Sequence, residues 1–221
     1  AKAEATRQIL TTWLQEQLPS RLRAIYRGKA YTAQDIFARV KKSEYGSVKD
    51  LINLIAAELL TPSFTERYPD YPAFERIPAP ITEARRPELA EDTLRAIATG
   101  LRNNVQRAIL AGLKLLGADD TIRTDQSPYA QHFRAILEAK EQAQVVNFSE
   151  VLEQVEVSGE PLYKDTRFHL EQHWVAVVLA ALVSDGRIVL KPSGNRALIE
   201  ADTIAQLATM RLDEVALFTL S

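Results

Sequence analysis

An unbroken run of ten apolar residues at 174–183, Trp-Val-Ala-Val-Val-Leu-Ala-Ala-Leu-Val, constrains the fold of this chain more than any other feature. It is shorter than the roughly 18 residues that a membrane-spanning helix needs. Its valines would also suit a buried strand, but its length, its alanines and the stop at Gly186 favour a helix over 169–184. A helix that is apolar on every side has to lie inside the protein. We therefore predict a buried helix that does not read DNA, because major-groove contacts need exposed Arg, Lys, Asn or Gln.

The elements predicted around this helix follow the order of a winged-helix domain. They are a helix opened by Ser127-Pro128, a strand at 144–146, a short helix at 149–155, the apolar helix, and strands at 187–191 and 196–199 around a turn. Helix, strand, helix, helix and hairpin is the winged-helix order. We predict a winged-helix-like domain over 122–221 with a small β-hairpin.

A helical region is predicted over 1–121, so the fold class is mainly α, within α+β. Its elements are an amphipathic helix at 3–18, a short strand at 22–26, helices capped by Thr32 and Ser47, and helices at 89–99 and 105–116 that glycines end. The segment 51–60 is apolar over a wide face, which we expect to be buried.

Five prolines between 62 and 80 predict an irregular loop inside this region. Four aromatic residues lie along it: Phe64, Tyr68, Tyr71 and Phe74. We expect the rings to hold the loop against a helical core. A partner-binding strip is the alternative.

Composition places the chain among cytoplasmic globular proteins. It has 46% hydrophobic and 25% charged residues, no cysteine and no signal peptide at its start. Its one methionine is Met210, so we expect Ala1 to lie inside a longer chain.

The net charge of −2 is unevenly distributed. Residues 1–50 hold ten Lys and Arg against five Asp and Glu, whereas the remainder holds seventeen against twenty-four. The candidate residues for contact with nucleic acid or a partner are Lys41, Lys42, Lys49, Arg187, Lys191 and Arg196, the last three on the predicted hairpin. An ordinary solvated surface is the alternative for both groups.

No pattern for catalysis is found. His169 and His173 are spaced for one helix face, but their Glu is third in line and matches no zinc-hydrolase motif. A phosphate-binding loop ending at Gly28-Lys29 would need Gly at 23 and Ser or Thr at 30, where the chain has Arg23 and Ala30. Asp119-Asp120 is interpreted as a solvated turn. We expect no metal, no cofactor and no catalytic residue here, so this region is predicted not to be an enzyme.

Four short stretches, in order, resemble large bacterial P-loop ATPases of the PglY/BrxC type, which belong to phage-exclusion (BREX) systems. They are Phe-Thr-Glu-Arg-Tyr-Pro-Asp-Tyr-Pro-Ala-Phe at 64–74, Ser-Pro-Tyr-Ala at 127–130, Gln-Val-Val-Asn-Phe-Ser-Glu at 144–150, and the apolar helix with its flanks at 168–202. The resemblance implies a region that follows the nucleotide-binding part of such an ATPase. The family's phosphate-binding residues have no counterpart in this chain.

The sequence thus predicts a non-catalytic coupling region of a phage-resistance-type ATPase. It would act by contact with partner proteins or DNA, including the remainder of the parent ATPase and other defence-system proteins, and with no membrane. The alternative is a stand-alone winged-helix module that binds nucleic acid. A hydrolase with an unrecognised site and self-association through 3–18 are also left open.

Overall fold

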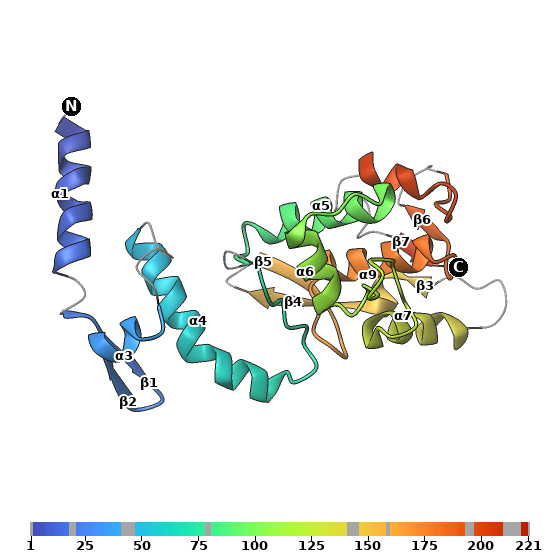
Figure 1. Ribbon diagram of the computed structural model, residues 1–221. Helices are drawn as coiled ribbons and strands as arrows, with labels where there is room; N and C mark the ends of the chain where they lie inside the picture. The colour runs from blue at the N-terminus through green and yellow to red at the C-terminus, as the bar shows by residue number, and fades with distance from the viewer. Residues whose placement is uncertain are drawn as a thin grey trace. The chain divides into compact units, whose positions relative to one another are not determined.

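The computed structural model describes residues 2–17, 21–40, 47–77, 81–140, 146–157, 160–192, 197–209 and 218–220 (Figure 1). The chain is mainly α-helical with small antiparallel sheets, as predicted. It divides into two compact units, Ala1–Pro69 and Asp70–Ser221. The predicted boundary between 121 and 122 falls inside the second unit, where α5 and α9 from either side of it pack together. None of the helices in the described ranges is long and apolar enough to cross a membrane.

The first unit joins helices to one β-hairpin. Its elements are α1 (Lys2–Glu16), β1 (Arg23–Tyr26), β2 (Lys29–Thr32), α3 (Ala33–Phe37) and α4 (Val48–Arg67). Arg27 and Gly28, both at positive φ, form the two-residue turn between β1 and β2. Thr32 caps α3 as predicted: its hydroxyl accepts the Asp35 amide, and Asp35 accepts the Thr32 amide in return.

The predicted wide buried face of α4 is wrong in part. Leu51 and Ile55 are buried with Ile36 and Val40, but Ile52 and Leu60 are 57% and 47% exposed, because this small core covers only a narrow stripe of the helix.

The predicted loop also begins later than expected. Pro62 lies inside α4, which runs on to Arg67. A single proline removes one backbone donor, whereas the next two prolines, Pro69 and Pro72, disfavour helix in the residues before them.

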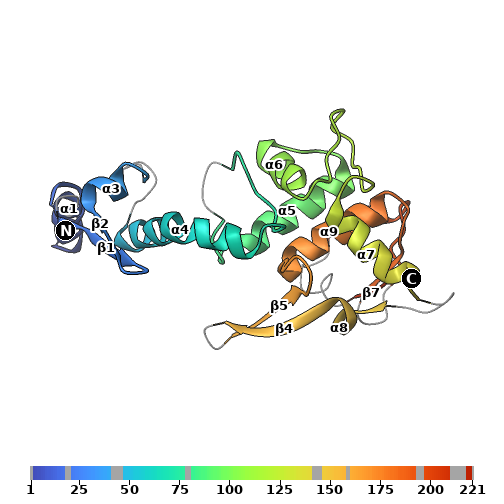
Figure 2. The same cartoon turned by 90° about the horizontal axis from the view of Figure 1, so that it is seen from below.

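The second unit is built around α9. Its elements are α5 (Arg86–Thr99), α6 (Asn104–Gly112), α7 (Pro128–Glu138), β3 (Val146–Asn147), α8 (Phe148–Val151), β4 (Leu152–Val157), β5 (Glu160–Asp165), α9 (Gln172–Ser184), β6 (Leu190–Pro192), the 3-10 helix η2 (Ile204–Thr209) and β7 (Phe218–Leu220). All ten residues from Trp174 to Val183 are buried, which confirms the central prediction. Helices α5 and α7 pack against α9 (Figure 2).

Helix α9 begins three residues later than predicted. The buried carboxylate of Asp165 accepts the backbone amides of Arg167, Phe168 and Leu170 at 3.0, 2.9 and 2.7 Å. These bonds hold the chain in a turn, and His169 takes a φ of +58° there. His169 and His173 therefore do not share a helix face, contrary to the prediction.

The sheets also differ from the prediction. Residues 152–157 form a strand, not the end of a helix, because Leu152-Glu-Gln-Val-Glu-Val pairs with β5 along its whole length. In the described part of the predicted partner strand, residues 197–199, the pairing with β6 is an isolated bridge, Leu190↔Ile199. Strand β6 pairs instead with β7, which also pairs with β3, so the sheet order is β3-β7-β6.

Candidate functional site

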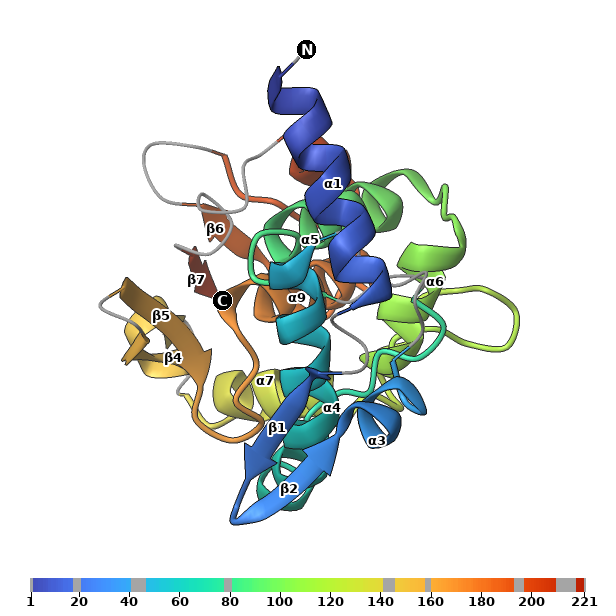
Figure 3. The ribbon, with the colours of Figure 1, turned by 90° about the vertical axis from the view of Figure 1, so that its left-hand side faces the viewer.

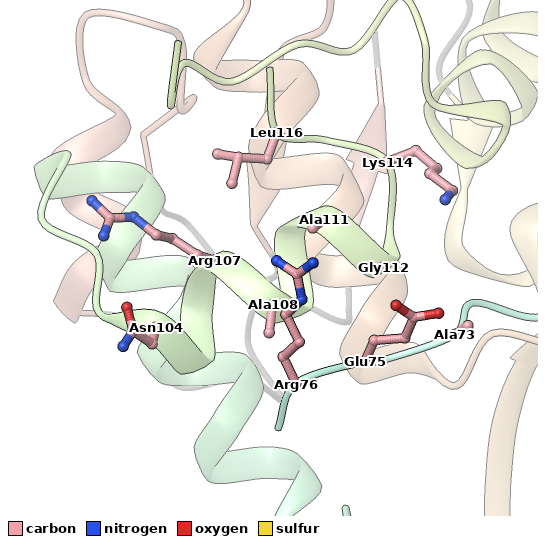
Figure 4. A pocket seen from close by; sticks show the side chains of 10 residues that line it. All are labelled: Ala73, Glu75, Arg76, Asn104, Arg107, Ala108, Ala111, Gly112, Lys114 and Leu116. Atoms are coloured by element: carbon pink, nitrogen blue, oxygen red, sulfur yellow. The ribbon is translucent and has the colours of Figure 1, made fainter. Parts of the chain in front are cut away.

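A pocket of about 670 Å³ lies beside α6 in the second unit (Figure 4). Its charged lining residues are Glu75 and Arg76 from the segment before α5, Arg107 from α6, and Lys114 from the turn after α6. Its apolar lining consists of Ala73, Ala108, Ala111 and Leu116. The pocket therefore combines three cations and one carboxylate with a wall of short apolar side chains.

The wall is formed by close packing of residues 73–74 against α6. A Cβ on Gly112 would lie 2.8 Å from a ring carbon of Phe74 and 2.9 Å from the carbonyl oxygen of Ala73. Only glycine leaves room for this approach. The Phe74 ring in turn packs on Trp174 at a centroid distance of 4.8 Å, so this side of the pocket is fixed to the core.

The other side is set by the way α6 ends. The amide of Leu115 donates to the Leu110 carbonyl and the amide of Lys114 to that of Ala111, which is the Schellman pattern. Leu110 and Leu115 are both fully buried, so their packing draws the chain into this turn. Lys114 occupies the left-handed position, φ +55°, that glycine usually takes. Helix α6 therefore ends at Gly112. The predicted end, just before Gly117, is wrong.

The cations of the pocket differ in their partners. Arg107 donates to both carboxylate oxygens of Asp120, at 3.1 Å from Nε and 2.9 Å from Nη2. This bond lowers the pKa of Asp120 and raises that of Arg107. Among the described residues, the side chains of Arg76 and Lys114 form no hydrogen bond and no ion pair. Two basic groups of the pocket thus carry uncompensated charge.

Arg76 shares a second feature with Lys114. Its φ is +64°, again in the left-handed region. In Figure 4 its guanidinium reaches over α6 between Arg107 and Glu75. The lining residues include no nucleophile paired with a base, so this geometry suits binding of an anionic group next to an apolar one.

Compared with known protein families, residues 86–220 match the fourth domain of a family of unknown function, DUF6079, and residues 1–68 match its third domain. The first match alone covers more than half of the chain. The chain belongs to the DUF6079 family. No curated protein and no solved structure matches it. The third-domain segment coincides with the first compact unit to within one residue, and the fourth-domain segment lies inside the second, which also includes residues 70–85.

The DUF6079 descriptions mention neither an ATPase nor phage exclusion. The resemblance to the PglY/BrxC type therefore stays a prediction.

The contact residues predicted from the sequence do not form one site in the described structure. Lys49 is exposed on α4 of the DUF6079 third domain, and Lys191 is exposed on β6 of the fourth. Arg187 pairs with Asp185 at 3.1 Å and with Asp125 at 3.4 Å, so its charge is compensated. Lys41, Lys42 and Arg196 lie outside the described residues. No local pattern pointed to Arg76 or Lys114, because their position depends on packing between distant segments.

A buried polar cluster lies at the start of α9 in the fourth domain. Glu171 accepts the Tyr71 hydroxyl at 2.7 Å and lies 3.5 Å from the guanidinium of Arg86. Burial, together with the charge of Glu171, raises the pKa of Tyr71. The cluster ties the segment before α5 to the N-terminus of α9.

His173 lies beside this cluster. Burial and the charge of Arg86 lower its pKa to about 4. Within the described residues, its buried Nδ1 has no hydrogen-bond partner, and no group of three or more metal-ligating side chains occurs.

Proposed function

We propose that this chain is a non-catalytic contact region whose second unit binds an acidic segment of a partner protein beside α6. The observation that carries the proposal is the pair of uncompensated cations, Arg76 and Lys114, next to an apolar wall. Carboxylates of the segment would meet the two basic groups, and an apolar side chain would cover Ala108 and Ala111.

The backbone at both cations supports this role. A non-glycine residue in the left-handed region costs roughly 1–2 kcal/mol, and glycine would avoid that cost. Arg76 and Lys114 both take this conformation and both face one pocket. Strain of this kind concentrates at functional sites.

Charge supports a protein segment over duplex DNA at this pocket. Residues 70–221 hold sixteen Lys and Arg against twenty-two Asp and Glu, a net charge of −6. A DNA duplex is many times longer than the Debye length of about 8 Å, so its phosphates would be repelled by the excess negative charge of this unit. A short peptide segment interacts mainly with the charges nearest to it, which here are the two cations. The buried helix α9 has no face with which to enter a groove.

The wider proposal is that the region couples a longer P-loop ATPase of the phage-exclusion type to its partners. The ordered sequence matches support it, as does the numbering of these segments as third and fourth domains. The winged-helix-like arrangement belongs to the same proposal and is supported by α7, α9 and the three-stranded sheet. A phosphate-binding motif encoded ahead of Ala1 in the same reading frame would agree with it, and a gene whose coding sequence begins at Ala1 would overturn it.

The pocket is tested with an array of short peptides that combine two or three Asp or Glu with one Leu or Phe. Each peptide has a matched version in which Asn and Gln replace the acids. We expect acid-dependent binding that weakens at least tenfold in an Arg76→Gly, Lys114→Gly double variant and is unchanged in Lys191→Ala. Binding that ignores the peptide's acids or the double variant would overturn the proposal, as would an array without any binding.

A further inference from the structure

The hairpin of the first unit lies in a segment that contains basic residues and no acidic residue. Between Gln17 and Gln34 the sequence contains Arg21, Arg23, Arg27 and Lys29 but no Asp or Glu. All four side chains are exposed, and in the described structure none of them forms an ion pair. The first unit as a whole holds eleven Lys and Arg against seven Asp and Glu, a net charge of +4. This surface attracts polyanions.

A groove of about 560 Å³ lies between the turn of this hairpin and the C-terminal half of α4. Figure 3 shows β1 and β2 beside α4. The Tyr26 hydroxyl donates to Oγ of Ser63 at 2.8 Å, which fixes the hairpin to the helix. The groove is therefore a defined feature of the first unit.

Aromatic rings and guanidinium groups alternate along the groove. The Phe64 and Tyr68 rings lie 4.9 Å apart, and the guanidinium of Arg67 lies over the Tyr68 ring at 5.5 Å. Arg27 lies over the Tyr26 ring at 5.6 Å in the same way. Phe64 is 44% exposed, and Glu66 is the one acidic residue that lines the groove. Such a surface offers flat apolar rings together with cations.

We propose that this groove binds a single-stranded nucleic acid, with phosphates along the basic hairpin and a base stacked on Phe64. Stacking on exposed rings requires bases that are not already paired and stacked, which favours a single strand over a duplex. An apolar protein segment would use the rings but would not need a hairpin without any acidic residue. Charge complementarity therefore selects the nucleic acid.

The test uses the full chain and fluorescence anisotropy with labelled oligothymidine and with a duplex of equal length. The logarithm of affinity should fall linearly with the logarithm of salt concentration, with a slope of about −0.7 per contacted phosphate. Arg23→Ala combined with Arg27→Ala should make this slope shallower by roughly one to two contacts. Lys49→Ala, which removes an exposed cation of α4 outside the groove, should leave the slope unchanged.

Stacking is tested with a matched pair on the same helix. Phe64→Ser should weaken oligothymidine binding roughly 5- to 150-fold, the range for loss of one base–ring stack. Ile52→Ser removes an exposed apolar side chain of α4 away from the groove, 57% exposed against 44% for Phe64, and should change little. Circular dichroism checks that both variants remain helical. If either variant loses helix, the same comparison is made with Phe64→Leu and Ile52→Val.

Three results would overturn the inference: no binding at low salt, equal affinity for duplex and single strand, or equal losses in the Phe64 and Ile52 variants. None depends on the pocket beside α6, so this inference and the proposed function fail separately.

Discussion

The two units of this chain distribute their apolar residues in opposite ways. In the described residues, thirty buried side chains form the core of the second unit, whereas four form that of the first. Of the nine large apolar side chains that are exposed there, seven lie in the first unit, among them Ile9, Trp13 and Phe64. The difference indicates that a large apolar core stabilises the second unit, whereas the first unit leaves apolar side chains exposed, as surfaces that bind other molecules do.

One substitution made in both units should give the largest contrast. Phe133 is fully buried in the second unit, and Phe64 is 44% exposed in the first. Phe133→Ala should lower the free energy of unfolding of the second unit by about 3–5 kcal/mol, because it leaves a cavity. Phe64→Ala should cost less than about 1 kcal/mol, since nearly half of this residue is already exposed and its loss leaves no enclosed cavity.

The measurement uses the fact that the chain has two tryptophans, Trp13 in the first unit and Trp174 in the second. In a Trp13→Phe background, urea unfolding followed by Trp174 fluorescence reports the second unit. For Phe64→Ala, amide hydrogen exchange over α4 reports the first. Similar losses of unfolding free energy for Phe133→Ala and Phe64→Ala would show that the two units do not differ in how they use their apolar residues.

Gly112 tests whether the pocket beside α6 depends on the core of the second unit. Gly112→Ala should destabilise that unit by about 1–3 kcal/mol, because the new Cβ clashes with Phe74 and Ala73. The intrinsic helix preference of alanine, about 1 kcal/mol, would offset part of this cost. Ala111→Ser, at an exposed neighbouring position, should stay within about 0.5 kcal/mol in the same urea titration.

Lys114 should show a conflict between stability and binding. Lys114→Gly should stabilise the second unit by about 1 kcal/mol, because it relieves a left-handed residue, while it weakens binding of acidic peptides. Lys114→Ala removes the same charge but keeps the Cβ, so it should weaken binding without this gain in urea midpoint. Equal stability of the two variants would show that the backbone at Lys114 is not strained.

The smallest expected effect is an acid sensitivity confined to the second unit. All three histidines lie there, and burial lowers the pKa of His132 and that of His173, the latter to about 4. The unfolded chain then binds more protons than the folded one between about pH 6.5 and pH 4, so stability is complete above this window and falls as the pH decreases through it.

The urea midpoint reported by Trp174 should therefore be lower at pH 5 than at pH 7. His173→Gln should reduce this decrease, because glutamine does not titrate. A decrease of the same size in His173→Gln, or a matching decrease in hydrogen-exchange protection of α4, would contradict the assignment.

Local sequence signals predicted those elements that depend on neighbouring residues alone. The buried helix at 174–183 follows from its lack of polar residues, and Thr32 and Ser127 cap helices where expected. The predicted end of α6 at Gly117 is wrong because the burial of Leu115, a tertiary effect, outweighs the preference of glycine for helix ends.

The candidate site was less predictable than the fold. Arg187 is paired by Asp125, which is 62 residues away, so no local pattern could indicate that its charge is compensated. Arg76 and Lys114 line one pocket because Phe74 packs against α6. From the sequence, this packing could be predicted only in the general form of aromatic rings against a helical core.

The central strand of the β3-β7-β6 sheet is the last of the three to leave the ribosome. Strands β3 and β6 do not pair with each other, so both keep an open edge until β7 has been synthesised. Open edges are sites of unwanted pairing with other chains. During translation the second unit therefore passes through a stage in which its core helix is complete but its sheet is not, and a chaperone would have most to protect at that stage.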